Sequence, residues 1–223
     1  MKKIVIRISL ILIVVIASFN SVSAQAFEGY IQYKLSGDEN SQLLDYYIKG
    51  ETIRFEIDAE GQKMASIIDK ENMIMLMPAQ KMYMEFSLKS LEEKAKMFAD
   101  DEDDEEDVDF DEANFTKGGT ETILGYECQK LSSKDEGRTF EMWIAKDLGD
   151  FKFMQGPMGG GNNWLSKLSD SGMFPLKMIA KNEDGTTQFK MEALKLEKKS
   201  LSNDLFKAPS NFRKMDMGGM FGN

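Results

Sequence analysis

The chain has 223 residues, with 28 Lys and Arg against 38 Asp and Glu, 17 Met, one Cys and no His. The absence of histidine excludes Ser-His-Asp and Cys-His catalytic arrangements and imidazole metal ligands, and one cysteine excludes an intramolecular disulfide and a cysteine-rich zinc site. A formal net charge of −10 argues against a nucleic-acid partner, which would need a basic surface patch, and we expect no cofactor.

The first residues have the pattern of a secretory signal peptide over 1–24. Three basic residues precede an apolar run over 8–19, and small residues at 21–24 follow it. The run of 12 residues is shorter than the roughly 20 that span a bilayer, so we expect cleavage after Ala24 rather than a retained membrane anchor. The mature protein is then periplasmic or secreted, without a stable membrane span.

After this cleavage site, the first half of the chain predicts six short strands separated by turn residues. The clearest alternation is at 53–57, where Ile53, Phe55 and Ile57 share one face of a strand. The six predicted strands cover 27–35, 44–48, 53–57, 64–69, 73–77 and 81–86. Ser87 then caps a predicted amphipathic helix over 88–98, whose apolar residues have helical spacing.

An acidic segment interrupts the strand pattern. Residues 100–112 contain 11 carboxylates in 13 positions, and such a block repels itself and buries little surface. It lacks the glycine-punctuated spacing of a calcium loop. We therefore predict a solvated acidic loop over 99–113.

The second half of the chain returns to strands. They are predicted at 120–124, 126–132, 139–146, 173–181 and 186–198, with a helical turn at 204–206 and a last strand near Phe212. A Gly-rich loop at 156–161 leads into a helical segment over 162–170, and residues 218–223 form a flexible tail. The sequence thus predicts one domain over 25–217 with a mainly β (α+β) fold. Its architecture is a curved antiparallel half-barrel of about eleven strands with one or two covering helices.

Four segments resemble the LolA/LolB-like superfamily, whose founding members are periplasmic carriers of lipoproteins. They are TILGYEC at 122–128, EMWIAKDL at 141–148, FPLKM at 174–178 and LFKAP at 205–209. Within that group the chain resembles an uncharacterised exported family. The resemblance implies a half-barrel in which helices cover an apolar cavity that holds acyl chains. The carriers use an arginine near the cavity, for which Arg54 and Arg138 are candidates.

The favoured function is therefore an exported, non-enzymatic binding protein that holds a hydrophobic ligand, either a lipid acyl chain or a lipidated partner. No enzyme signature is present; Cys128 is interpreted as a packed strand residue. The predicted ligand-binding residues, on the walls and lid of the cavity, are Tyr46, Phe55, Met75, Met84, Phe140, Trp143 and Trp164.

Two alternatives remain open. The first is an envelope protein-interaction or sensor domain, in which the acidic loop steers a partner by charge. The second is periplasmic Cu(I) binding, because thioethers are soft ligands and alternation places methionines together on neighbouring strands. The methionines concerned are Met73, Met75, Met77, Met82 and Met84. Methionine as an adaptable filler of an apolar wall explains the same pattern.

Overall fold

The computed structural model of the chain describes residues 27–37, 41–59, 61–91, 115–135, 137–145, 148, 151 and 173–215. The predicted signal peptide, acidic loop and tail lie outside the described residues, as do the Gly-rich loop at 156–161 and the segment 162–170. These features and the domain limits 25–217 stay predictions.

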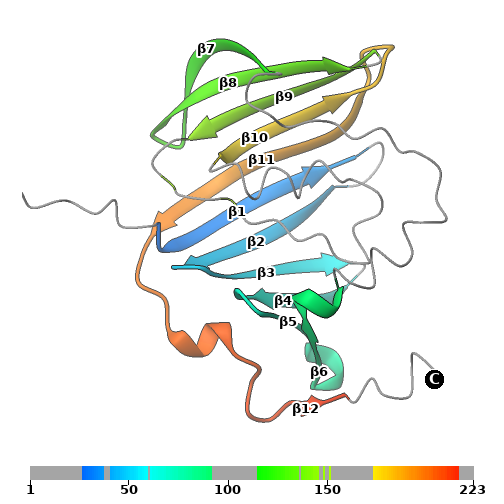
Figure 1. The fold of residues 1–223 in the computed structure, drawn as a ribbon, viewed down its shortest axis with the longest axis vertical. Coiled ribbons are helices and arrows are strands. Elements are labelled where there is room, and N and C mark those ends of the chain that lie inside the picture. The colour runs from blue at the N-terminus through cyan, green and yellow to red at the C-terminus, as the bar shows by residue number, and fades with distance from the viewer. Residues whose placement is uncertain are drawn as a thin grey trace, which may run out of the picture.

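A sheet of 12 strands dominates the described structure (Figure 1). Its strands are β1 (Gly29–Ser36), β2 (Ser41–Lys49), β3 (Thr52–Ala59), β4 (Gln62–Ile68), β5 (Asn72–Met77), β6 (Met82–Ser87), β7 (Thr116–Ile123), β8 (Tyr126–Asp135), β9 (Arg138–Ala145), β10 (Phe174–Lys181), β11 (Thr187–Lys198) and β12 (Arg213–Lys214). Helix in the described residues is confined to 88–91, where the predicted covering helix begins, and to the 3₁₀ turns η1 (Pro78–Gln80) and η4 (Asn203–Phe206). None of the described helices has the length and hydropathy of a membrane-spanning segment.

Two antiparallel meanders, β1–β6 and β7–β11, join along one seam to form the sheet (Figure 1). The strand order is β12-β6-β5-β4-β3-β2-β1-β11-β10-β9-β8-β7, so the first strand lies beside the eleventh. At the other edge, β12 pairs in parallel with β6. The described sheet does not close into a barrel. The predicted mainly β, antiparallel half-barrel is therefore confirmed, with 12 strands where the sequence indicates about eleven.

The seam between the meanders begins at a glycine. Gly29 pairs with Lys198, and the pairing continues to Ser36 and Lys190. A Cβ atom at Gly29 would lie 2.1 Å from the carbonyl oxygen of Glu197 and 2.7 Å from the ring of Phe27. Because no side chain fits at such a distance, glycine is what allows β1 to start this close to β11.

Alternation along the strands gives the sheet two faces of different chemistry, because successive side chains point to opposite sides. Ile31 and Tyr46, with exposed fractions of 0% and 1%, lie on what we call the core face. Their neighbours Tyr30 and Asp45 lie on the opposite, outer face. Phe55 is in register with Tyr46, so the apolar positions predicted at 53–57 continue the core face across β3.

An aromatic residue from outside the strands covers part of the core face. Phe151 is fully buried and stacks on Tyr46 with ring centroids 5.5 Å apart. Its ring also meets Phe174 and Tyr33 edge to face, at 5.4 and 6.3 Å. The buried Tyr33 hydroxyl donates to the carbonyl oxygen of Pro175 at 3.0 Å, so this aromatic cluster leaves no orphaned hydroxyl at Tyr33.

The segment after β11 covers the outer face of the opposite half of the sheet. Phe206, Ala208 and Phe212 pack against a small buried cluster contributed by β4 and β5. The buried members of that cluster are Ala65, Ile67 and Leu76. The closing segment at 205–209, which carries part of the sequence resemblance, therefore has a clear structural role as the cover of this cluster.

Hydrogen bonds fix that segment at several points. The backbone N–H of Leu201 donates to Glu28 Oε1 at 2.7 Å, and Lys49 Nζ donates to the carbonyl oxygen of Leu201. Further along, Arg54 Nη1 donates to the carbonyl oxygen of Leu205 at 3.0 Å. Ser202 caps η4 by accepting from the N–H of Asp204, which fixes the turn that presents Phe206 to the sheet.

Candidate ligand-binding face

The burial of side chains on the core face differs between parts of the sheet. On β9, β10 and β11, the methionines Met142, Met178 and Met191 have exposed fractions of 2%, 2% and 1%. From β3 to β6 the same face is mixed: Ile53, Ile68 and Met73 are buried, whereas eight other apolar side chains are half-buried. These residues, which we call the methionine-rich patch, are Phe55, Ile57, Met64, Met75, Met77, Met82, Met84 and Phe86.

The strand register assembles the patch from neighbouring rows. One row runs across β3, β4, β5 and β6, because Phe55 pairs with Ser66, Ser66 with Met75, and Met75 with Met84. A second pair, Met77 and Met82, lies one step further along β5 and β6. Directly opposed residues of an antiparallel pair have Cβ atoms about 4.5–5.5 Å apart. The patch therefore extends over four strands, with the buried Ser66 at the β4 position of its first row.

The side chains of the patch and of its neighbours on the same face are almost all apolar. Among its described neighbours on the same face between Met64 and Phe86, Ser66 is the polar side chain, and it is 6% exposed. Charged residues of these strands lie on the outer face instead; Glu85, for example, pairs with Lys214 at 2.5 Å. Flexible methionines can adjust to the shape of what they contact, so the patch suits an apolar guest better than an ionic one.

The structure brings together four of the residues predicted to bind ligand. Tyr46, Phe55, Met75 and Met84 lie in one cross-strand row of the core face. Tyr46 is sealed beneath Phe151, whereas the other three are half-buried members of the patch. Of these four residues, Tyr46 could contact a ligand only if Phe151 moved away from it.

The remaining predicted residues are elsewhere. Phe140 is buried on β9, in the sealed half of the sheet. Trp143, also on β9, is in register with Lys130 and Lys177, whose ammonium nitrogens lie 4.9 and 4.2 Å from its ring centroid. This places Trp143 under two lysines on the outer face. Trp164 lies outside the described residues.

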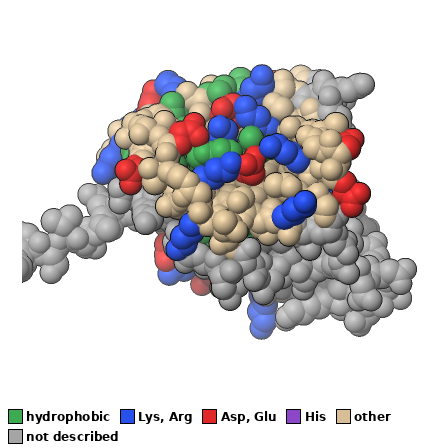
Figure 2. Space-filling view, turned by 90° about the horizontal axis from the view of Figure 1, so that it is seen from above, with side chains coloured by type: hydrophobic (Ala, Val, Ile, Leu, Met, Phe, Trp, Pro, Cys, Tyr) green, Lys and Arg blue, Asp and Glu red, His purple; other side chains and the backbone are tan. Residues whose placement is uncertain are grey.

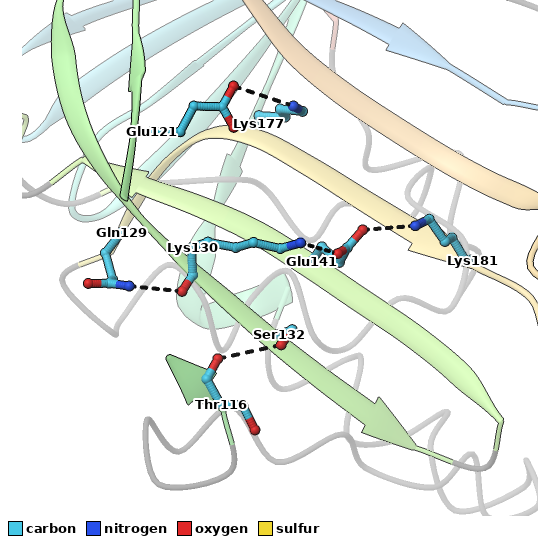
Figure 3. Close-up of polar contacts among 8 residues, drawn as sticks. All are labelled: Thr116, Glu121, Gln129, Lys130, Ser132, Glu141, Lys177 and Lys181. Atoms are coloured by element: carbon cyan, nitrogen blue, oxygen red, sulfur yellow. Dashed lines mark hydrogen bonds and ion pairs between the residues drawn. The ribbon is translucent and has the colours of Figure 1, made fainter. Parts of the chain in front are cut away.

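The outer face around Trp143 is a network of paired charges (Figure 3). Glu141 lies between Lys130 and Lys181, with the Lys181 ammonium 2.9 Å away, and Lys177 faces Glu121 at 3.8 Å. Hydrogen bonds from the two lysines lower the pKa of Glu141. Seen from the β7 edge, positive and negative side chains are interspersed over the surface (Figure 2), unlike the apolar patch.

The candidate arginines also lie away from the patch. Arg54 projects to the outer face, where its guanidinium pairs with Glu56 at 2.6 Å and binds the backbone of Leu205. Arg138 is an exposed residue at the start of β9. The structure thus gives Arg54 a role in holding the C-terminal segment.

Sequence reasoning missed some residues of this face. Ile57, Met64 and Phe86 belong to the patch but were not predicted to contact ligand. The alternation that groups Met82 with Met84 would also have added Phe86. Phe151 had no comparable signal, because it lies outside any strand and its partners are distant in sequence.

Comparisons with known proteins agree with this fold. A family model described as "Domain of unknown function (DUF4412)" matches residues 27–212. An uncharacterized conserved protein from Thermus thermophilus has a similar structure, with a TM-score of 0.51 and 12% identity, over 86% of this chain and 91% of that one. The comparison with curated proteins finds no match.

Two further solved structures are similar at lower scores. One is the MucA/MucB complex of Pseudomonas aeruginosa, with 11% identity and a TM-score of 0.48, over 85% of this chain and 58% of that one. The other is a domain described as outer membrane lipoprotein-sorting, from Vibrio parahaemolyticus, with 14% identity and a TM-score of 0.29, over 80% and 87% of the two chains.

Proposed function

The chain belongs to the DUF4412 family over residues 27–212, and from this premise we propose that it is an exported, non-enzymatic protein that binds a hydrophobic ligand on the methionine-rich patch. The ligand is a lipid acyl chain, free or attached to a partner protein. Export to the periplasm or the exterior is supported by the signal-peptide pattern at 1–24.

The observation that carries this proposal is the half-buried state of the patch. The same face is buried at Met142, Met178 and Met191, and also at Ile53, Ile68 and Met73, whereas the eight apolar side chains of the patch keep partial contact with solvent. Apolar surface left in water costs about 25 cal/mol per Å². A ligand that covers the patch recovers this free energy, at roughly 0.8 kcal/mol per buried CH₂ group.

The composition of the patch supports an acyl chain over a polar ligand. Its members are methionine, isoleucine and phenylalanine, and the described charged residues of β3–β6 lie on the outer face, as Arg54 and Glu85 do. A polar head group would find no ionic partner on β3–β6 themselves; a cation next to the patch is Arg213 of β12, whose Nη2 lies 3.9 Å from Met82 Sδ. Binding would then tolerate apolar chains of different length and shape, because flexible methionine side chains adapt to both.

Two measurements test the proposal. Mass spectrometry of lipid extracts from protein purified without detergent is expected to find bound acyl chains, and delipidated protein is expected to take up a fluorescent fatty acid. If the purified protein carries no lipid and the delipidated protein takes up none, the proposal is wrong.

Substitutions locate the ligand on the sheet. Met75→Glu places a charge within the patch and is expected to abolish fatty-acid uptake. The matched control is Leu43→Glu, because Leu43 is an apolar residue of β2 that is 48% exposed and faces Lys34 across the strand pair. This control is expected to bind as the native protein does. Equal uptake by both folded variants would contradict binding at the patch.

A further inference from the structure

Beyond its apolar area, the patch carries a compact group of thioether sulfurs. Met75 and Met84 are directly opposed on β5 and β6, and Met77 follows Met75 on the same face. Positions two apart on a strand are about 7 Å apart, and opposed Cβ atoms are about 5 Å apart. Methionine has three rotatable side-chain bonds, so three sulfur atoms can meet around one point between these strands.

The three methionines are not fully enclosed. Met75, Met77 and Met84 are half-buried, so part of each residue is in contact with solvent. Their neighbour Met82 differs, because its Sδ accepts a contact from Arg213 Nη2 at 3.9 Å. We therefore assign the site to the other three methionines and leave Met82 with its guanidinium partner.

Other soft donors are scarce in this protein. The chain contains no histidine and one cysteine. That residue, Cys128, is fully buried on β8, so its neighbours would have to move before a metal ion from solvent could reach the thiol. A soft metal ion at the surface would therefore find thioethers as its sulfur donors.

We propose that Met75, Met77 and Met84 form a three-thioether site for a soft monovalent metal ion, Cu(I) or Ag(I). Thioethers prefer such ions to Zn(II) and to the hard divalent ions. The ion binds without a change of oxidation state, and neutral thioethers release no proton when they coordinate it. The site uses sulfur atoms rather than apolar area, so it does not depend on the acyl-chain proposal.

Titration of the mature protein with Ag(I) tests the site, because silver is redox-inert. One ion is expected to bind per chain, with the same affinity at pH 5 and at pH 7.5, and with no competition from Zn(II). Anaerobic titration with Cu(I) against a chelator is expected to give the same stoichiometry. Affinity that falls in acid would indicate titrating ligands and overturn the proposal.

Matched triple variants distinguish this site from other methionines. The variant M75L/M77L/M84L is expected to lose Ag(I) binding, whereas M142L/M178L/M191L, which changes three sealed methionines of the same face, is expected to keep it. Single Met84→Leu serves if either triple variant fails to fold, and Cys128→Ala removes the thiol as a competing donor. Retained binding in M75L/M77L/M84L, or binding lost with Cys128 alone, would overturn the assignment.

The same variants separate this proposal from the proposed function. Leucine keeps the apolar volume of methionine, so M75L/M77L/M84L is expected to take up fluorescent fatty acid while it loses silver. Loss of silver binding with retained fatty-acid uptake supports both proposals. If M75L/M77L/M84L still binds silver, the thioether site is refuted, whatever its fatty-acid uptake. The acyl-chain proposal is judged separately, by lipid extraction and by the Met75→Glu and Leu43→Glu variants.

Discussion

Arg54 on β3 donates from Nη1 to the backbone carbonyl oxygen of Leu205 at 3.0 Å, across 151 positions of sequence. The same guanidinium pairs with Glu56, and the Arg54 side chain is only 13% exposed. This single side chain therefore links the first meander to the segment that follows the last long strand. Because the segment covers the outer-face cluster of β4 and β5, the contact supports the strands that carry the methionine-rich patch.

Replacing Arg54 tests that link. Arg54→Met keeps an apolar stem and removes the guanidinium, so the free energy of unfolding in urea is expected to fall by about 1.5–3 kcal/mol, the usual effect of a hydrogen bond to a charged group. Lys70→Met is the control, because the ion pair of Lys70 with Glu51 has side chains 68% and 59% exposed and contributes little. Equal losses in the two variants would show that Arg54 does not anchor the segment.

The close approach of β1 to β11 predicts that replacing Gly29 lowers the stability of the protein. Gly29→Ala is expected to reduce the free energy of unfolding by about 1–3 kcal/mol, as overpacking does, since the new Cβ would meet the Glu197 carbonyl at 2.1 Å. Gly119→Ala on β7 is the matched control, because a Cβ there has no heavy atom within 4 Å. Urea denaturation of both variants measures the difference. An unchanged Gly29→Ala protein would mean that the seam is looser than described.

The turn between β7 and β8 offers a stabilising change. Leu124 has a φ of +50° and is followed by Gly125 at +87°, which is the backbone of a hairpin turn that favours asparagine and glycine. A left-handed conformation costs a leucine roughly 1–2 kcal/mol, and Leu124 is 43% exposed, so little burial is lost on replacement. Leu124→Asn is expected to raise Tm by roughly 2–4 °C.

A β-branched residue at the same turn gives the opposite expectation. Leu124→Val is expected to lower Tm, because branching at Cβ is least compatible with positive φ. Thermal unfolding followed by circular dichroism compares the two variants with the native protein. If Leu124→Asn and Leu124→Val shift Tm in the same direction, backbone strain at this position is not the cause.

The charge network on the outer face predicts a dependence of stability on pH. Hydrogen bonds from Lys130 and Lys181 lower the folded-state pKa of Glu141 below its ordinary value of 4.5. A lowered folded pKa stabilises the protein above the unfolded pKa, and this contribution disappears as the pH falls through the folded pKa. Glu141→Gln is therefore expected to be less stable than the native protein at pH 7 and to approach it below pH 4.

Urea denaturation at the two pH values measures this convergence. Glu71→Gln is a suitable control, because Glu71 is an exposed residue of the turn between β4 and β5. Its stability difference from the native protein is expected to stay small at both pH values. A Glu141→Gln difference that does not change with pH would rule out the carboxylate as its source.

Local patterns predicted the strands because each strand alternates in its own sequence. Ile53, Phe55 and Ile57 needed only period two to be assigned to one face, and the helical turn at 204–206 was correctly placed as part of η4. The pairing of β1 with β11 had no such signal, since residues such as Gly29 and Lys198 lie at opposite ends of the chain. Which strands meet is a property of the whole topology.

The candidate site was harder to predict, because burial is decided by what packs from outside the strand. Met75 and Met178 both occupy core-face positions of their strands, yet one is half-buried and the other is 2% exposed. Trp143 was assigned to a cavity wall on hydrophobicity alone. Its ring instead lies beneath Lys130 and Lys177, whose aliphatic stems can cover an aromatic surface while their charges stay in water.

The pairing of the first strand with the eleventh also governs how the chain can fold as it emerges from a ribosome or a translocation pore. Each meander consists of neighbours that can pair soon after they appear, but one edge of β1 must wait for residues 190–198. Such distant pairing slows folding. The centre of the sheet therefore cannot be completed before residues 190–198 have been delivered, even though the first meander is by then long available.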